Sequence, residues 1–220
     1  MILLSRKLNF PPPESAGDDG LLCMGGDLSV ERLLLAYRNG IFPWYEGDIP
    51  IWWNPDPRFV LFPGDLKVSK SMKQVLKRKD FTITCNTHFL DVIRNCQQAK
   101  REDQNGTWIN EDVIDAYNRL HELGYAISYE AWQDSELVGG FYGLRIGQVF
   151  FGESMFSKLS NASKAAFITG VQDLIRKDIQ LIDCQVYTPH LESLGAGMIA
   201  RKDFLALLKQ LIKNEADANS

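Results

Sequence analysis

The stretch that decides the fold is QVFFGESMFS at residues 148–157, together with LIDCQV at residues 181–186. Both runs have the length and the apolar content of buried strands, and the segment between them can form a helix. Each run also carries a carboxylate, Glu153 in the first and Asp183 in the second. A carboxylate in an apolar core costs free energy unless it is paired or used in chemistry, so we expect a functional site on these strands.

The segments around this stretch predict a mixed sheet. Alternating apolar residues favour three strands, joined by short polar turns into an antiparallel meander, over residues 126–132, 137–144 and 148–156. A helix capped by Asn161 or Ser163 then crosses to a strand at 180–187. The pattern predicts an α+β fold. A mixed-sheet domain of the acetyltransferase (GNAT) type would span residues 58–220, and a small irregular domain would span residues 1–57.

Composition and charge exclude several classes of protein. The chain has 220 residues, 45% apolar and 24% charged, as is typical of a soluble globular protein. It has no apolar run long enough to span a bilayer and no signal peptide, so we expect a cytoplasmic protein without membrane contact. A net charge of −4 argues against sequence-independent binding of long nucleic acid. The four cysteines have no C-x-x-C spacing, which disfavours structural zinc and disulfides, and we expect no metal.

One predicted helix, residues 69–79, has a basic face. Its apolar residues form one stripe, whereas Lys70, Lys73 and Lys77 line the opposite side with no acidic residue among them. Lysines on a common face can hold a phosphate backbone, although a solvated helix face would have the same pattern. Further helices are predicted from Asn86, as N-cap, and over residues 110–123.

Asp183 and Gln185 are candidates for the chemistry. Side chains alternate along a strand, so both should project from one face and hydrogen-bond side by side, while Cys184 points away. An aspartate fixed by a neighbouring amide can act as a general base, and the alternative is a polar pair at a strand end. Cys184 as a nucleophile with His190 is disfavoured because of its direction.

Glu153 follows Gly152, and a glycine inside a strand indicates a bulge. A bulge would shift the alternation, so that Phe150, Glu153 and Met155 face one cavity. The alternative is that the aromatic residues are ordinary core and that Glu153 is a satisfied edge residue. Acetyl coenzyme A is not expected as a cofactor, because the connection over residues 157–164 lacks the glycine-rich turn that its pyrophosphate requires.

Seven blocks of sequence, in order, resemble the bacterial leucyl/phenylalanyl-tRNA–protein transferases. The blocks are GIFPW at 40–44, WWNPDPR at 52–58, GTWI at 106–109, GESMFS at 152–157, NASK at 161–164, LIDCQV at 181–186 and SLGA at 193–196. The resemblance implies a small N-terminal domain on an acetyltransferase-like domain. It also implies an enzyme that moves Leu or Phe from tRNA to the N-terminal Arg or Lys of a protein and so creates a degradation signal (N-degron).

The resemblance further implies the roles of individual residues. Trp44 and Trp108, with Tyr37 and Tyr117 nearby, would surround the terminal adenosine of the tRNA 3′ CCA end, because bases stack on aromatic side chains. Six residues would line or edge the pocket for the amino-acid side chain: Phe141, Phe150, Glu153, Met155, Phe167 and Ile182. Ile182 does not fit the alternation, since it should face away from Asp183. The basic face at Lys70, Lys73 and Lys77 would then hold the acceptor stem.

Asp183 and Gln185 match the catalytic pair of the similar family. An aminoacyl ester is already activated, and an α-amino group with a pKa of about 7.7–8.0 is partly neutral at cellular pH. Asp183 would orient the attacking amine and accept its proton or stabilise its charge, while Gln185 fixes the carboxylate; the tRNA ribose hydroxyl is an alternative proton relay. Leucyl-tRNA, phenylalanyl-tRNA and acceptor proteins would be the partners of a monomeric enzyme. A coenzyme A-dependent acetyltransferase and a binding module without catalysis are the alternatives.

Overall fold

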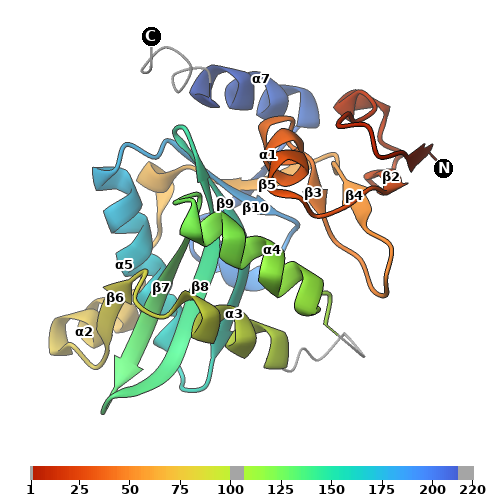
Figure 1. The fold of residues 1–220 in the computed structure, drawn as a ribbon. Coiled ribbons are helices and arrows are strands. Elements are labelled where there is room, and N and C mark those ends of the chain that lie inside the picture. Colours follow the sequence, from red (N-terminus) through yellow and green to blue (C-terminus); the bar gives the residue numbers. More distant parts are fainter. Residues whose placement is uncertain (1, 100–106, 213–220) are drawn as a thin grey trace, which may run out of the picture.

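The structure of the protein is a computed structural model that describes residues 2–99 and 107–212 (Figure 1). Gly106 of the GTWI block lies outside these residues. Two sheets run through the described part, one of four strands and one of seven, and helices cover the larger sheet on both faces. The predicted α+β fold with a mixed sheet is confirmed.

The larger sheet has the strand order β11-β5-β10-β9-β8-β7-β6. Its strands are β5 (Arg58–Leu61), β6 (Thr82–Cys85), β7 (Ala126–Gln133), β8 (Glu136–Ile146), β9 (Val149–Ser157), β10 (Leu181–Gln185) and β11 (Gly197–Ile199). The strands β7, β8 and β9 form the predicted antiparallel meander. The helix α5 (Ala162–Arg176) then crosses over, so that β10 pairs with β9 in parallel. On its other side β10 pairs antiparallel with β5.

Two buried clusters of apolar side chains hold the helices on the sheet. One cluster joins α5 and α2 (Lys70–Arg78) to one face. The other joins the opposite face to α1 (Val30–Arg38), α3 (Phe89–Gln98), α4 (Glu111–Glu122) and α7 (Arg201–Ile212). In Figure 1, α3 and α4 cross in front of the strands and α7 lies above α1. A short helix, α6 (Pro189–Ser193), and two 3₁₀ turns, Pro13–Ser15 and Pro63–Asp65, complete the described elements.

The smaller sheet was not predicted. Its order is β1-β2-β4-β3, from β1 (Ile2–Leu4), β2 (Leu21–Gly25), β3 (Phe42–Pro43) and β4 (Ile51–Trp53). Strands of two to five residues between glycines and prolines are too short to show a period of two. Trp52 of β4 also joins this sheet through its side chain, which is buried and donates from its indole Nε1 to the carbonyl of Gly25 in β2 at 2.9 Å.

The helices predicted at residues 69–79 and 110–123 are confirmed as α2 and α4. Asn161 lies directly before α5, as predicted, but its side chain makes no cap hydrogen bond. Ser69 and Asn110 accept a hydrogen bond from the first turn of α2 and α4, respectively. The cap at Asn86 was predicted wrongly, because α3 begins only after His88. Asn86 has a φ of 58°, and its side-chain oxygen accepts from the Ser128 backbone N–H at 2.9 Å, so it joins a turn to β7. None of the helices described in 2–99 and 107–212 is long and apolar enough to span a membrane.

Candidate active site

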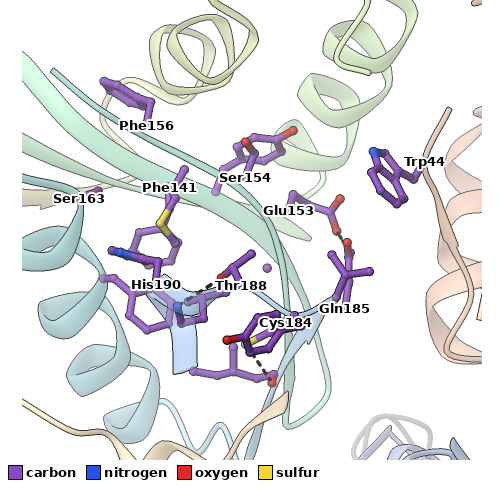
Figure 2. Close-up of a pocket in the computed structure, with 18 of the residues that line it drawn as sticks. Trp44, Phe141, Glu153, Ser154, Phe156, Ser163, Cys184, Gln185, Thr188 and His190 are labelled. Atoms are coloured by element: carbon purple, nitrogen blue, oxygen red, sulfur yellow. Dashed lines mark hydrogen bonds between the residues drawn. The ribbon is translucent and has the colours of Figure 1, made fainter. Parts of the chain in front are cut away.

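A cavity of about 680 Å³ opens between the ends of β9 and β10, α5, α6 and the loop that carries Trp44. The parallel pairing of the two strands stops at Phe151 and Asp183, and residues of both strands beyond this point line the cavity. Figure 2 shows Glu153 and Gln185 next to Trp44, joined by a hydrogen bond, and His190 at the other end of the cavity. The site therefore has a polar end and a largely apolar body.

A bulge in β9 directs Glu153 into the cavity. Tyr142 of β8 pairs with Ser154 and the next residue, Gly143, pairs with Gly152, so Glu153 is the extra residue. The bulge predicted from Gly152 is confirmed. Glu153 and Met155 both line the cavity, whereas Phe150, which was expected beside them, does not.

A second bulge, in β10, separates Asp183 from Gln185. The register against β5 shifts between these two residues, and Gln185 has a φ of 64°, in the left-handed region. Asp183 therefore faces one side of the sheet, whereas Ile182, Cys184 and Gln185 line the cavity. The prediction that Asp183 and Gln185 share a face was wrong, because strict alternation does not pass through a bulge. The same observation explains why Ile182 can belong to the pocket.

Asp183 is fully buried and ion-paired with Arg58, which is fully buried too. Arg58 donates from Nε to Oδ1 of Asp183 at 2.8 Å and from Nη2 to Oδ2 at 2.6 Å. The guanidinium lies between the rings of Phe42 and Phe204, at 4.7 and 4.6 Å from their centroids. This ion pair joins β5 and β10 to the smaller sheet and α7.

Asp183 also holds the backbone of Gln185. Its Oδ1 accepts from the Gln185 backbone N–H at 2.9 Å, which stabilises a left-handed conformation that costs roughly 1–2 kcal/mol in a residue other than glycine. The side chain of Gln185 then reaches the cavity, where its Nε2 donates to Oε1 of Glu153 at 3.0 Å. Asp183 thus touches Gln185 through the backbone, not side by side as the sequence predicted.

Glu153 is hydrogen-bonded to two tyrosines behind the cavity wall. The Tyr37 hydroxyl lies 2.7 Å from Oε1 and the Tyr117 hydroxyl 3.0 Å from Oε2, and the two hydroxyls also hydrogen-bond each other. Burial raises the pKa of Glu153 to about 8, against the lowering effect of its hydrogen bonds. Tyr37 and Tyr117 are wholly buried and do not form part of the cavity surface, so they lie near the site without facing it.

The body of the cavity is apolar. Of the six pocket residues, Phe141, Met155, Phe167 and Ile182 line it along with Glu153, while Phe150 lies behind with its ring centroid 6.0 Å from that of Phe141. Phe141 packs closely on α5 because a glycine faces it: a Cβ on Gly170 would lie 2.6 Å from Cζ of Phe141. The aromatic wall therefore depends on a glycine in a helix, where glycine costs roughly 1 kcal/mol relative to alanine.

Trp44 and Trp108 both line the cavity. Trp44 is 36% exposed and packs beside Trp53, whose indole Nε1 donates to the Trp44 carbonyl at 2.6 Å. Trp108 is nearly buried. The three lysines of α2 are exposed and do not line the cavity.

The family model described as leucyl/phenylalanyl-tRNA protein transferase matches residues 60–209, and the model of the N-terminal domain of the same transferases matches residues 26–56. The chain belongs to this family. The curated transferase of Flavobacterium johnsoniae is 55% identical over 210 residues, covering 95% of this chain and 99% of the relative. The transferase of Syntrophobacter fumaroxidans is 54% identical over 210 residues, covering 95% of this chain and 90% of the relative. The resemblance found in the seven blocks is confirmed.

Among solved structures, the chain is similar to a GCN5-related N-acetyltransferase from Kribbella flavida. The TM-score is 0.40 at 11% identity, and the match covers 76% of this chain and 60% of that chain. A match to L-PGS from Bacillus licheniformis has a TM-score of 0.43 at 13% identity, covering 78% of this chain and 57% of that chain.

The sequence of this transferase family member did not reveal Arg58 as part of the site. The signal was available, because Arg58 precedes the apolar run FVLF at residues 59–62, but the prolines before it suggested a domain boundary. His190 also lines the cavity, and its buried Nε2 has no hydrogen-bond partner among the described residues. Burial, with a smaller effect from Lys164, lowers the pKa of His190.

The alternative of a cysteine nucleophile loses support from the geometry. Burial raises the pKa of the Cys184 thiol far above its ordinary value, which disfavours a thiolate nucleophile. Across residues 2–99 and 107–212, no group of three or more His, Cys, Asp or Glu side chains is arranged to hold a metal ion.

Proposed function

We propose that the protein transfers leucine or phenylalanine from aminoacyl-tRNA to the N-terminal Arg or Lys of acceptor proteins, forming a peptide bond. The new N-terminus marks the acceptor for degradation. The observation that carries the proposal is the family match over residues 60–209 together with a cavity whose apolar body ends at Gln185 and Glu153.

The apolar body of the cavity suits a leucyl or phenylalanyl side chain. Phe141, Phe167 and Ile182 offer it no polar partner, so a charged or strongly polar side chain would lose its hydration without compensation. Discrimination among apolar side chains by such a pocket is modest, at roughly 1–3 kcal/mol per methylene group. We therefore expect the cavity to select the transferred amino acid first by the polarity of its side chain and second by its size.

The tRNA would be held at two places. Trp44 and Trp108 offer aromatic surface for the terminal adenosine, with about 1–3 kcal/mol per stacked base. Tyr37 and Tyr117 would support this region from behind through Glu153. The exposed lysines of α2 would hold the phosphates of the acceptor stem.

The reaction would use Gln185 at the substrate and Asp183 behind it. An aminoacyl ester needs no further activation, and holding amine and ester together can contribute about 7–11 kcal/mol to lowering the barrier. Gln185 lines the cavity and can hydrogen-bond the attacking amine, whereas Asp183 is satisfied by Arg58 and by the Gln185 backbone. This geometry favours Asp183 as a positioning residue. The amide oxygen of Gln185 would hold an N–H of the amine, and the proton that the amine loses would pass to the ribose oxygen of the tRNA that leaves as the ester bond breaks, directly or through solvent or the neighbouring ribose hydroxyl.

No acetyl coenzyme A is needed in this scheme. The connection before α5 has no glycine, and Asn161 makes no side-chain cap at its start. We further propose that the enzyme acts as a monomer in the cytoplasm, where its aminoacyl-tRNA substrates are made.

The proposal is tested by incubating the protein with Phe-tRNA carrying labelled phenylalanine and an Arg-initiated peptide. We expect label on the peptide N-terminus, and no label on a matched peptide that begins with Ala. Acetyl coenzyme A in place of the tRNA should leave both peptides unmodified. Binding of Phe-tRNA without transfer would instead support the binding module, and acetylation would support the acetyltransferase.

A further inference from the structure

Three oxygen-bearing side chains form a closed ring at the polar end of the cavity. Tyr37 comes from α1, Tyr117 from α4 and Glu153 from β9. The ring has three oxygen–oxygen contacts: Tyr37 to Oε1 of Glu153 at 2.7 Å, Tyr117 to Oε2 at 3.0 Å, and Tyr37 to Tyr117. Each contact needs one hydrogen between its two oxygens.

The two tyrosines supply only two of the three hydrogens. If Glu153 is ionised, both hydroxyls donate to the carboxylate, and the contact between Tyr37 and Tyr117 joins two oxygens with no hydrogen between them. If Glu153 is neutral, its own proton completes the ring. The carboxyl donates to one tyrosine, that tyrosine donates to the other, and the second tyrosine donates back to the carboxyl.

The surroundings also favour the neutral acid. Tyr37 and Tyr117 are wholly buried, the Tyr142 ring of β8 lies 5.7 Å from that of Tyr117, and the charge of Asp183 on β10 acts on Glu153. Arg58 of β5 is paired with Asp183 and not with Glu153. Burial is the largest cause of the raised pKa of Glu153, and the charge of Asp183 adds to it.

The closed ring also fixes the position of the oxygen to which the Gln185 amide donates. Oε1 of Glu153 receives both the Tyr37 hydroxyl and Nε2 of Gln185, as the carbonyl oxygen of an acid can, while the proton sits on Oε2 toward Tyr117. The Gln185 nitrogen is thereby held at Glu153, which leaves the amide oxygen of Gln185 for a donor from the substrate.

We propose that Glu153 carries the third proton of this ring at neutral pH and, in that form, is the positioning residue that aims the amide oxygen of Gln185 at the acceptor amine. The second half of this statement rests on the proposed function. Above the pH at which the proton leaves, Tyr37 and Tyr117 lose one hydrogen bond of the ring, so the carboxyl group that positions Gln185 is no longer fixed on both sides.

The substitution Glu153→Gln separates this proposal from a role for a negative charge. A glutamine amide can reproduce the neutral ring, because its oxygen can accept from Tyr37 and Gln185 while its nitrogen donates to Tyr117. It cannot titrate. Glu153→Ala removes the ring altogether, and Glu136→Gln, at an exposed position of β8, is the matched control for loss of a carboxylate.

The protonation state is measured first, by infrared spectroscopy on the free enzyme. We expect a carboxylic acid band at pH 7 that shifts in D₂O, fades as the pH passes about 8, is missing in Glu153→Gln and remains in Glu136→Gln. An enzyme without that band at pH 7 would overturn the proposal. This measurement uses no tRNA, so it stands even where the proposed function fails.

The consequence for Gln185 is measured by single-turnover transfer over a range of pH. We expect Glu153→Gln to transfer faster than Glu153→Ala at pH 7, because only the glutamine side chain can close the ring again. The ratio of the wild-type rate to the Glu153→Gln rate should fall about tenfold per pH unit above the titration. A flat ratio, or a Glu153→Gln enzyme as slow as Glu153→Ala at pH 7, would contradict the positioning role, since purely structural support has no such pH profile.

Discussion

Arg58 donates two hydrogen bonds to Asp183, from Nε at 2.8 Å and from Nη2 at 2.6 Å to the two carboxylate oxygens, and neither side chain is exposed. A carboxylate held in this way cannot swing to the substrate without leaving an arginine unpaired in the core. The same Asp183 oxygen that meets Arg58 also accepts from the Gln185 backbone. The ion pair therefore sets the conformation from which Gln185 reaches the cavity.

Breaking this ion pair should cost both stability and turnover. Arg58→Met and Asp183→Asn each leave a buried polar group without its partner, which typically costs about 3–5 kcal/mol for a charge left alone and less for the neutral amide. We expect a lower melting temperature and slower single-turnover transfer from the same samples, with the affinity for aminoacyl-tRNA preserved wherever the protein is folded.

The double variant Arg58→Met, Asp183→Leu separates the two effects. An apolar pair of similar size should restore much of the stability, but it lacks the acceptor for the Gln185 N–H, so transfer should stay slow. Recovery of normal transfer in the double variant would show that Asp183 does not act through Gln185.

The stability of the protein should fall with rising pH because of Glu153. Its pKa in the folded state is about 8, above that of an ordinary carboxyl, so the folded state binds one proton more than the unfolded state between the two values. The unfolding free energy should then drop by at most about 1.4 kcal/mol per pH unit between the ordinary carboxyl pKa and about 8, and level off above. Urea unfolding of the wild type and Glu153→Gln across this window isolates the effect. Parallel curves for the two proteins would mean that Glu153 titrates normally.

The amino-acid pocket should widen when Met155 is shortened. Met155→Ala removes a flexible apolar side chain from the cavity wall, so the preference should move toward bulkier side chains by roughly 1–3 kcal/mol. Competition between Leu-tRNA and tRNA charged with tryptophan measures this shift. Efficient transfer of a charged amino acid by the wild type would rule out the apolar pocket itself.

The basic face of α2 should govern the salt dependence of tRNA binding. Replacing Lys70, Lys73 and Lys77 with alanine should weaken tRNA binding and reduce the steepness of log K against log salt by about one per lysine. The rate of transfer at saturating tRNA should stay the same. Alanine at Lys202 and Lys209, which are exposed on α7, is the control. An unchanged slope in the triple variant would show that the three lysines are only a solvated face.

The sheet and its helices could be predicted from sequence because their signals are local. The meander and the crossover helix each follow from periodicity and turn signals within one segment. The division of the chain into two domains at Pro57 stays a prediction. The smaller sheet could not be predicted from sequence, because strands of a few residues depend on partners distant in the chain for their hydrogen bonds.

The site could be predicted in its residues but not in its geometry. Glu153, Asp183 and Gln185 stand out as polar residues in apolar strands. The directions of their side chains depend on two bulges. Gly152 indicates the first bulge, in β9, but no glycine indicates the second, which lies between Asp183 and Gln185 in β10. The partner of Asp183 also comes from 125 residues away, and no local pattern indicates it.

The central claim is tested most directly by single-turnover transfer of labelled phenylalanine from Phe-tRNA to an Arg-initiated peptide, with Gln185→Ala beside the wild type. Gln180→Ala, at an exposed position just before β10, is the control. We expect the wild type and the control to label the peptide alike, and Gln185→Ala to be folded and to bind tRNA but to transfer on the order of 100-fold more slowly. No label on the peptide with the wild type, or an undiminished rate in Gln185→Ala, would contradict the account.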